Sequence, residues 1–335
     1  MSKIRGFWRS ILRFSTVTLA LILLVVPAAA ETQQAQSLPR LAHVVPAPPG
    51  CKISTVSEAF LQGLHDRGYV DGVTINVDRR CYSTPDQLPS ILQDVIARRV
   101  NVIVAAGNIA AEAAKRATST IPIVMVHTDP VGTGLVASLA RPGGNVTGVS
   151  GTPPELAGKR LEILKQLNPR LSRVTLLFEP EIDPRARDEI ETASRALRLT
   201  LQASAIRTLE DLNRAFDSVA RNHPDAVVVH AGAGVITVYR QRIIDWAKEQ
   251  RLPLMFNLSQ TVEEGALVSY GADNHDVYRR LVSGYVDKIL KGADPAGLPV
   301  EQPTRFTLLL NLKTAKAIHL AIPQSLLQSA DRLVE

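Results

Sequence analysis

Short apolar runs alternate with helix-like segments along most of the chain. One such unit consists of an apolar run at 100–107, a helical stretch and a second apolar run at 121–126. Another unit repeats this order, with its apolar runs at 224–232 and 252–256. In both units the first run ends at glycine and the second opens with a residue–proline pair. Strands that alternate with helices predict βαβ units around a parallel sheet. Two such units predict two similar lobes with a cleft between them.

The same pattern predicts the remaining elements of an α/β fold. The expected strands lie at 41–45, 73–77, 146–150, 174–178, 199–203, 266–270 and 306–310, and near Val100, Ile123, Val227 and Leu254. The expected helices lie at 56–67, 85–99, 109–117, 156–167, 184–197, 209–221, 235–250 and 277–290, with a closing helix at the C-terminus. Gly68 is the expected stop of the first helix.

Two of these strands are expected to cross between the lobes, at 146–150 and 266–270. The expected division of the chain follows from them. It is a signal peptide at 1–30, a spacer at 31–38, lobe 1 at 39–148 plus 268–300, and lobe 2 at 149–267 plus 301–335.

The N-terminus predicts export from the cytoplasm. Four basic residues precede an apolar stretch at 17–26, and a run of small residues ends at Ala30. This order is typical of a secretory signal peptide cleaved near Ala30, which predicts a periplasmic protein. The alternative is a retained anchor helix, but the apolar stretch is short for a membrane span. The apolar stretch is not followed by a cysteine, which argues against a lipid-anchored form.

Removal of the signal peptide changes the charge balance. The whole chain has 38 basic and 32 acidic residues and a net charge of +6. The first thirty residues include four basic residues and no acidic ones, so the remaining chain has a net charge of +2. A protein that binds nucleic acid usually carries a strong basic patch. The balance therefore argues against a nucleic-acid partner.

The two cysteines, Cys51 and Cys81, both follow the expected cleavage site and would lie in an oxidising compartment. Cys51 lies after the first expected strand and Cys81 near the end of the second. Those strands are neighbours in a doubly wound sheet, so a disulfide is favoured. The alternative is a pair of unpaired, partly buried thiols.

Polar and small residues follow several of the expected strands. In open parallel sheets, ligands bind at the carboxyl ends of the strands, where loops and helix N-termini converge. This rule selects 46–51, 80–82, 106–108 and 127–129 in lobe 1, and 179–183, 230–234 and 257–260 in lobe 2. The alternative explanation is that these loops are polar because they are exposed.

Motifs for catalysis and for cofactor binding are missing from the sequence. It contains neither a P-loop nor a complete dinucleotide-binding glycine motif, and neither a nucleophile elbow nor a zinc-protease motif. His127 and His230 both follow strands, and a metal site between them is an alternative. Scattered histidines are more often ordinary loop residues. We therefore expect no catalytic residue, no metal and no cofactor.

Four segments resemble one known family. They are DPVGTGLVASLARPGGNVTGVS at 129–150, GKRLEILK at 158–165, VSYG at 268–271 and the segment 306–317. The chain resembles the ABC-transporter substrate-binding family related to tryptophan and tyrosine uptake proteins. The similar segments follow one another in the same order, from about Leu38 to the C-terminus. The resemblance implies a type I periplasmic-binding-protein fold, with two doubly wound αβα lobes joined by crossing strands.

The resemblance also implies a set of ligand-binding residues in the cleft. Carried over by position, they are Gly107, Asn108, Thr128, Asp129, Thr147, Asn257 and Asn311. Gly107 and Thr128 are expected to donate to an anionic group, and either Asp129 or Glu179 to pair with an amino group. Tyr82 or Phe256 is expected to stack on the ligand.

The chain departs from the family pattern at two places. Cys81 stands where many members carry an aromatic residue, and Glu179-Pro180 stands where the family often has Asn-Pro. The Glu179 carboxylate would favour a cationic or amino-bearing ligand. The alternative is that this carboxylate faces the solvent.

The function implied by the resemblance is that of an extracytoplasmic solute-binding protein of an ABC importer. It would close about a hinge on a small polar ligand, by default an aromatic or other amino acid. Its expected partners are this ligand and the ABC permease, with membrane contact only through the permease, and the protein is expected to be a monomer. Two alternatives are a ligand-sensing module that acts on a receptor kinase and an exported enzyme on the same scaffold.

Overall fold

The computed structural model describes residues 38–51, 54–180, 184–232 and 234–335, with the backbone alone at Thr128. The expected signal peptide and all of the spacer except Leu38 lie outside the described residues. Among the helices that the structure describes, none has the length and apolar character needed to cross a membrane.

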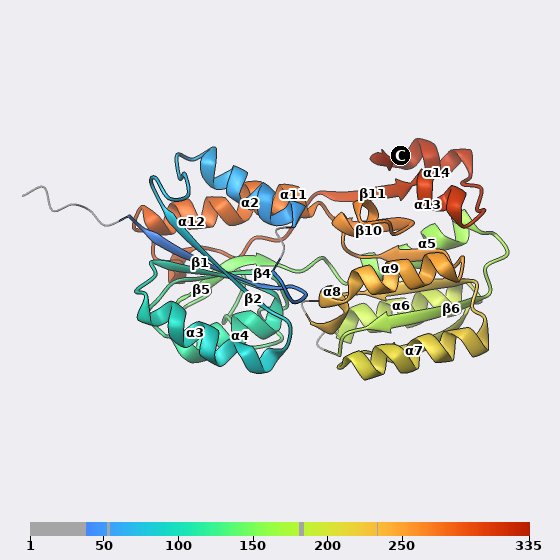
Figure 1. Cartoon of the computed structure of the whole chain (residues 1–335), viewed down its shortest axis with the longest axis horizontal. Helices are drawn as coiled ribbons and strands as arrows, with labels where there is room; N and C mark the ends of the chain where they lie inside the picture. Colours follow the sequence, from blue (N-terminus) through green and yellow to red (C-terminus); the bar gives the residue numbers. More distant parts are fainter. Residues whose placement is uncertain (1–37, 52–53, 181–183, 233) are drawn as a thin grey trace, which may run out of the picture. The chain divides into compact units, whose positions relative to one another are not determined.

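The N-terminal part of the described chain forms a five-stranded parallel sheet, with the strand order β2-β1-β3-β4-β5 (Figure 1). Its strands are β1 (Arg40–Pro46), β2 (Asn76–Tyr82), β3 (Val102–Ala106), β4 (Ile123–Thr128) and β5 (Val146–Ser150). The helical elements beside it are α2 (Thr55–His65), η1 (Pro85–Gln87), α3 (Leu88–Ala97), α4 (Gly107–Ala117), α11 (Asn274–Asp276), η2 (Val277–Val282), α12 (Ser283–Leu290) and η3 (Pro295–Gly297).

Both faces of this sheet are covered. One hydrophobic cluster packs α3 and α4 against one face, and another packs α2, η2 and α12 against the opposite face. Because helices cover both faces of the sheet, every residue of the central strand β3 is buried. This explains why the strand appears in the sequence as an uninterrupted apolar run.

The second sheet has seven strands in the order β12-β11-β10-β9-β8-β6-β7. They are β6 (Arg173–Phe178), β7 (Thr200–Ala205), β8 (Ala226–His230), β9 (Leu254–Phe256), β10 (Val268–Ala272), β11 (Phe306–Asn311) and β12 (Arg332–Val334). The helices around it are α5 (Leu156–Leu167), α6 (Pro184–Ala196), α7 (Leu209–Asn222), α8 (Val235–Val238), α9 (Arg240–Glu249), α10 (Gln260–Glu263), α13 (Leu312–Ala317) and α14 (Gln324–Ser329). The pair β10–β11 is antiparallel, and the other pairs of neighbouring strands described in this sheet are parallel.

These two sheets confirm the predicted fold class. The chain passes from the first sheet to the second after β5, returns after β10 to add α11, η2 and α12, and crosses again before β11. β10 pairs with β9 and β11, so 268–272 belong to the second sheet. The second part of lobe 1 was expected to begin at residue 268. In the structure the chain returns to the first sheet only after residue 272, because 268–272 pair with strands of the second sheet.

The strands β2 and β12 also differ from the sequence prediction. β2 begins at Asn76 and not at residue 73, because 71–75 form a turn in which Gly72 donates to the carbonyl of Ile75. β12 was not predicted, and it pairs in parallel with β11. Its three residues carry too little pattern to distinguish a short edge strand from a loop.

A disulfide links Cys51 to Cys81, with 5.6 Å between the Cα atoms, which confirms the predicted pairing. Cys81 lies opposite Val45 in the register of β1 and β2. The bond therefore ties the loop after β1 to the strand beside it.

Replacement of both cysteines by serine should destabilise the protein. The bond closes a loop with a sequence separation of 30, and the chain-entropy account gives such a loop between about 3 and 4 kcal/mol of stability. Urea unfolding of the wild type and the double variant measures this difference. The double variant should also be insensitive to reductant. Equal unfolding free energies would show that the bond adds nothing to stability.

Candidate ligand-binding cleft

A cavity of about 1340 Å³ lies at the carboxyl ends of the strands of both sheets. Ligand sites in proteins usually measure about 300–1000 Å³, so the cavity has room for a small molecule and surrounding water. Its lining from the first sheet includes His43, Ala47, Gly107, Asn108, His127, Asp129 and Tyr278, and its lining from the second sheet includes Glu179, His230, Gly232, Arg240, Asn257 and Glu264.

On the side of the first sheet, the ends of β3 and β4 are joined by hydrogen bonds. The backbone N–H of Asp129 donates to Asn108 Oδ1 over 3.0 Å. Asp129 Oδ1 in turn accepts from the N–H of Gly132 over 3.1 Å. Gly107 makes the sharp turn from β3 into α4 at φ +83°, a conformation that L side chains rarely adopt. Three of the predicted residues therefore form one local unit at the cleft.

On the side of the second sheet, Glu179 does not face the solvent. Its carboxylate accepts hydrogen bonds from the backbone N–H groups of Gly232 over 2.8 Å, Gly234 over 3.0 Å and Ile236 over 2.8 Å. The residue is only 2% exposed. A Cβ at Gly232 would lie 2.7 Å from Glu179 Oε2, so a side chain there would force the carboxylate to shift. The carboxylate therefore holds the backbone at Gly232, Gly234 and Ile236.

Asn257 has a similar role beside Glu179. Its side-chain amide donates to the carbonyl of Ala231 over 2.8 Å and accepts from the N–H of Ala231 over 2.9 Å. This pair of bonds joins the ends of β8 and β9. Asn257 lines the cleft as predicted, and its amide supports the wall of the cleft.

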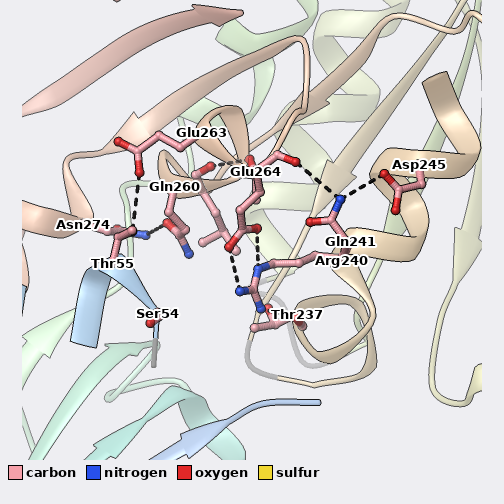
Figure 2. A network of polar contacts seen from close by, with 12 residues as sticks. Ser54, Thr55, Thr237, Arg240, Gln241, Asp245, Gln260, Glu263, Glu264 and Asn274 are labelled. Atoms are coloured by element: carbon pink, nitrogen blue, oxygen red, sulfur yellow. Dashed lines mark hydrogen bonds and ion pairs between the residues drawn. The ribbon is translucent and has the colours of Figure 1, made fainter. Parts of the chain in front are cut away.

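A polar network extends along the wall of the second sheet (Figure 2). Arg240 donates to both carboxylate oxygens of Glu264, over 2.6 and 2.7 Å, and to the carbonyl of Thr237 over 2.8 Å. Such a bidentate pair neutralises both charges at the surface of the cleft. Sequence reasoning missed Arg240 and Glu264 because both follow strand-end loops by several residues.

Two contacts in the same figure link helices of the two sheets. Asn274 of α11 donates to Gln260 Oε1 of α10 over 2.7 Å. Thr55 of α2 donates to Glu263 Oε2 over 3.4 Å. α2 and α11 therefore contact α10 through two hydrogen bonds, one between neutral amides and one from a hydroxyl to a carboxylate. Water can replace the partners in both bonds.

Three histidines line the cleft, and one ring nitrogen of each is buried without a hydrogen-bond partner among the described residues. These atoms are Nε2 of His43 and His127 and Nδ1 of His230. Burial lowers the pKa of His43 to about 3, with a further contribution from the charge of Arg79. Burial likewise lowers the pKa of His127 to about 4, and that of His230 to about 3 with help from the charge of Arg160. All three imidazoles are therefore neutral at pH 7.

Several predicted residues do not line the cavity. Thr147 is buried and donates to the carbonyl of Leu298 over 2.7 Å. Asn311 caps α13 by accepting from the N–H of Thr314, and its amide donates to the carbonyl of Val262. Phe256 is fully buried in the core of the second sheet.

Tyr82 is also outside the cavity lining and is only 2% exposed. Burial raises the pKa of its hydroxyl, and the nearby charge of Glu179 raises it further. Thr128 contributes its backbone to the end of β4, between His127 and Asp129 of the lining.

The described residues also bear on the metal alternative. Among them, no group of three or more His, Cys, Asp or Glu side chains is arranged to hold a metal ion.

Comparison with known proteins identifies the family. A family model described as ABC transporter substrate binding protein matches residues 51–334, which confirms the resemblance seen in the sequence. A tyrosine-binding protein from Clostridioides difficile (strain R20291) is 28% identical over 277 residues, or 79% of this chain and 77% of that protein.

Two solved structures share the fold. The ABC domain in complex with L-Trp from Streptococcus pneumonia matches with a TM-score of 0.77 and 23% identity, over 89% of this chain and 100% of that chain. A ligand-free, open substrate-binding protein with adhesive properties from Clostridium difficile matches with a TM-score of 0.60 and 22% identity, over 89% and 99% of the two chains. At these identities, the two structures are evidence for the fold alone.

The buried imidazoles predict that acid destabilises the protein. The pKa of His43 is about 3 in the folded state and 6.5 in its ordinary environment. Below pH 6.5 the unfolded chain therefore binds more protons, and the unfolding free energy should fall as the pH decreases toward 4. The slope is at most about 1.4 kcal/mol per pH unit for each such histidine.

Urea unfolding of His43→Gln between pH 7 and 4.5 should show a slope that is shallower by about one proton. The exposed His65 provides the matched control, because His65→Gln removes a histidine from the surface of α2. Equal slopes for both variants and the wild type would contradict the assignment.

Proposed function

Because the chain belongs to the ABC transporter substrate-binding protein family, we propose that it captures a small molecule in the cleft and presents it to an ABC permease. The observation that carries this proposal is a cavity lined by the strand ends of two separate sheets. The N-terminal segment, with its basic residues, apolar stretch and small residues, supports export to the periplasm. Permease contact would be the protein's connection to the membrane.

Capture would proceed by closure of the two lobes about the crossing segments. Each sheet keeps its own core, and the chain passes between them at three places, after β5, after β10 and before β11. Such segments can absorb a hinge rotation without disturbing either core. The cavity is larger than a single amino acid, so closure would exclude water and bring both walls onto the ligand.

The ligand class that we propose is an amino acid, with an aromatic one as the default. A tyrosine-binding relative at 28% identity supports this choice. Asp129 lines the cavity and offers a carboxylate to an amino group. Gly107 and Asn108 open the eleven-residue helix α4, whose first N–H groups suit a carboxylate. The Glu179 carboxylate is already engaged by backbone N–H groups, so Asp129 is the preferred partner for the amino group.

The substitution Asp129→Asn tests this assignment. It keeps an oxygen for the N–H of Gly132 but removes the charge, and a hydrogen bond to a charged group contributes about 1.5–3 kcal/mol. Affinity for L-tyrosine or L-tryptophan in isothermal titration calorimetry should therefore fall by about 10- to 100-fold. Asp86→Asn, on the exposed η1 turn, is the matched control and should bind like the wild type.

Thermal unfolding gives an independent readout. A ligand at a hundredfold its dissociation constant should stabilise the wild type by about 2.7 kcal/mol. Unchanged affinity in Asp129→Asn would refute the role of Asp129. If amino acids, nucleobases and small carboxylates all fail to bind, the capture function itself is wrong.

A further inference from the structure

The edge of the second sheet that lies opposite the cleft carries a row of arginines. The cavity lies at the carboxyl ends of the strands, and the parallel strands β9, β8, β6 and β7, which are neighbours in that order, all begin at the other edge. Arg251 precedes β9, Arg221 precedes β8, Arg170 precedes β6 and Arg198 precedes β7, and all four are exposed. Since neighbouring strands lie about 4.8 Å apart, the four arginines stand in adjacent connections. We call them the distal basic edge.

Three of these connections hold a basic residue in a backbone conformation that favours glycine. The φ angle is +55° at Arg198, +45° at His223 and +54° at Arg251. His223 is the left-handed cap of α7. Helices commonly end at a glycine in this conformation, because glycine adopts it without a steric penalty. The chain therefore keeps basic side chains at positions where glycine would fit with less strain.

Helices beside the first sheet neutralise the corresponding charges. At the C-terminal ends of α3, α4 and α12, a basic residue pairs with a carboxylate four residues earlier. These pairs are Arg98–Asp94 over 3.1 Å, Arg116–Glu112 over 3.6 Å and Lys291–Asp287 over 2.8 Å. Among the described residues, none of the four arginines of the distal basic edge forms an ion pair. The helix macrodipole favours a cation in both sheets, so it does not explain why one set lacks carboxylate partners.

Two acidic residues lie in or beside the four connections. The carboxylate of Asp225 accepts from the backbone N–H groups of Ser172 and Arg173, each over 2.8 Å, and from the Ser172 hydroxyl over 2.9 Å. It is therefore occupied by the backbone at the start of β6. Glu249, at the end of α9, is exposed. The edge thus has an excess of positive charge.

A surface of phosphate groups fits these unpaired arginines. A guanidinium binds phosphate oxygens through two parallel hydrogen bonds, and each basic residue near an anionic membrane adds to the attraction. A stable protein interface has an apolar centre instead. In the described part of the chain, the exposed large hydrophobic residues are Val70, Val73, Val131 and Leu333, and none of them lies in the four connections. The edge therefore favours lipid headgroups over a protein partner.

We propose that the distal basic edge binds the anionic phospholipid headgroups of a bilayer. This contact goes beyond the proposed function, in which the permease alone connects the protein to the membrane. The cavity lies at the opposite ends of the same strands, so lipid contact and ligand capture use separate surfaces. The contact would keep the protein at the surface in which the permease lies.

Sedimentation with lipid vesicles tests the proposal on protein purified from the periplasm. Vesicles of equal parts phosphatidylglycerol and phosphatidylcholine should bind the wild type, and vesicles of phosphatidylcholine alone should not. Binding should be lost between about 0.1 M and about 1 M salt, because the Debye length falls from about 10 Å to about 3 Å.

The triple variant Arg198→Gln, Arg221→Gln, Arg251→Gln should bind the mixed vesicles about 100-fold more weakly, at about fivefold for each arginine. The corresponding arginine-to-lysine variant keeps the charge and should retain most of the binding. The matched control changes Arg99, Arg116 and Arg141 of the first lobe to glutamine. These three are also exposed, and Arg99 has a φ of +54°. The control loses the same net charge and should bind like the wild type.

Folding and ligand capture are measured in parallel. Each variant should unfold at the temperature of the wild type to within a few degrees, because the substituted side chains are exposed. Each should also keep the wild-type affinity for L-tyrosine or L-tryptophan. Vesicle binding without capture of any small molecule would refute the proposed function and leave the distal basic edge intact.

Three results would overturn the inference. The wild type may not exceed its phosphatidylcholine binding on the mixed vesicles, or the control may lose as much binding as the edge variant. In the third, the wild type ignores vesicles, but its binding to the purified permease weakens in the edge variant, which assigns the edge to a protein partner.

Discussion

Polar groups at the carboxyl ends of buried strands must find partners, because leaving them unpaired away from water is costly. In the second lobe the chain itself meets this constraint at Glu179 and Asn257. Glu179 accepts from the backbone N–H groups of Gly232 and Gly234, after β8, and of Ile236 in α8, and Asn257 pairs with both backbone groups of Ala231. The backbone at Ala231, Gly232 and Gly234 is therefore held in place before any ligand arrives. A preformed wall of this kind lowers the cost of ordering the protein upon binding.

The first lobe meets the same constraint only in part. The backbone N–H of Asp129 donates to Asn108 Oδ1 across the ends of β3 and β4. The imidazoles of His43 and His127, in contrast, keep a buried nitrogen that is unpaired within the described structure. His230 of β8 does the same on the other wall, so each lobe brings at least one such imidazole to the lining of the cleft.

Much of the fold could be predicted from the sequence because its central strands are buried on both faces and are therefore continuously apolar. The run that became β3 shows this clearly. The apolar pattern did not predict the short strand β12 or the point at which the chain leaves the second sheet after β10. Both depend on pairing with β11. Glu179 was placed correctly at a strand end, but its backbone partners depend on the path of a loop some fifty residues later.

Some of the residues predicted at the cleft line it, and others do not. Gly107, Asn108, Asp129 and Asn257 line it, because strand ends of a parallel sheet share one edge. Thr147 and Asn311 do not, because each finds a local backbone partner first. His43 gave a signal that was overlooked, as a polar residue inside an otherwise apolar strand.

A crystal structure of the protein with its co-purified ligand, or with L-tyrosine, tests the central claim most directly. The account predicts ligand density between the ends of β4 and β8, with the two lobes closed upon it. It also predicts that the amino group of the ligand lies about 3 Å from a carboxylate oxygen of Asp129, which is hydrogen-bond distance. Ligand density outside the cleft, or a bound ligand that contacts only one lobe in the closed crystal form, would contradict the account.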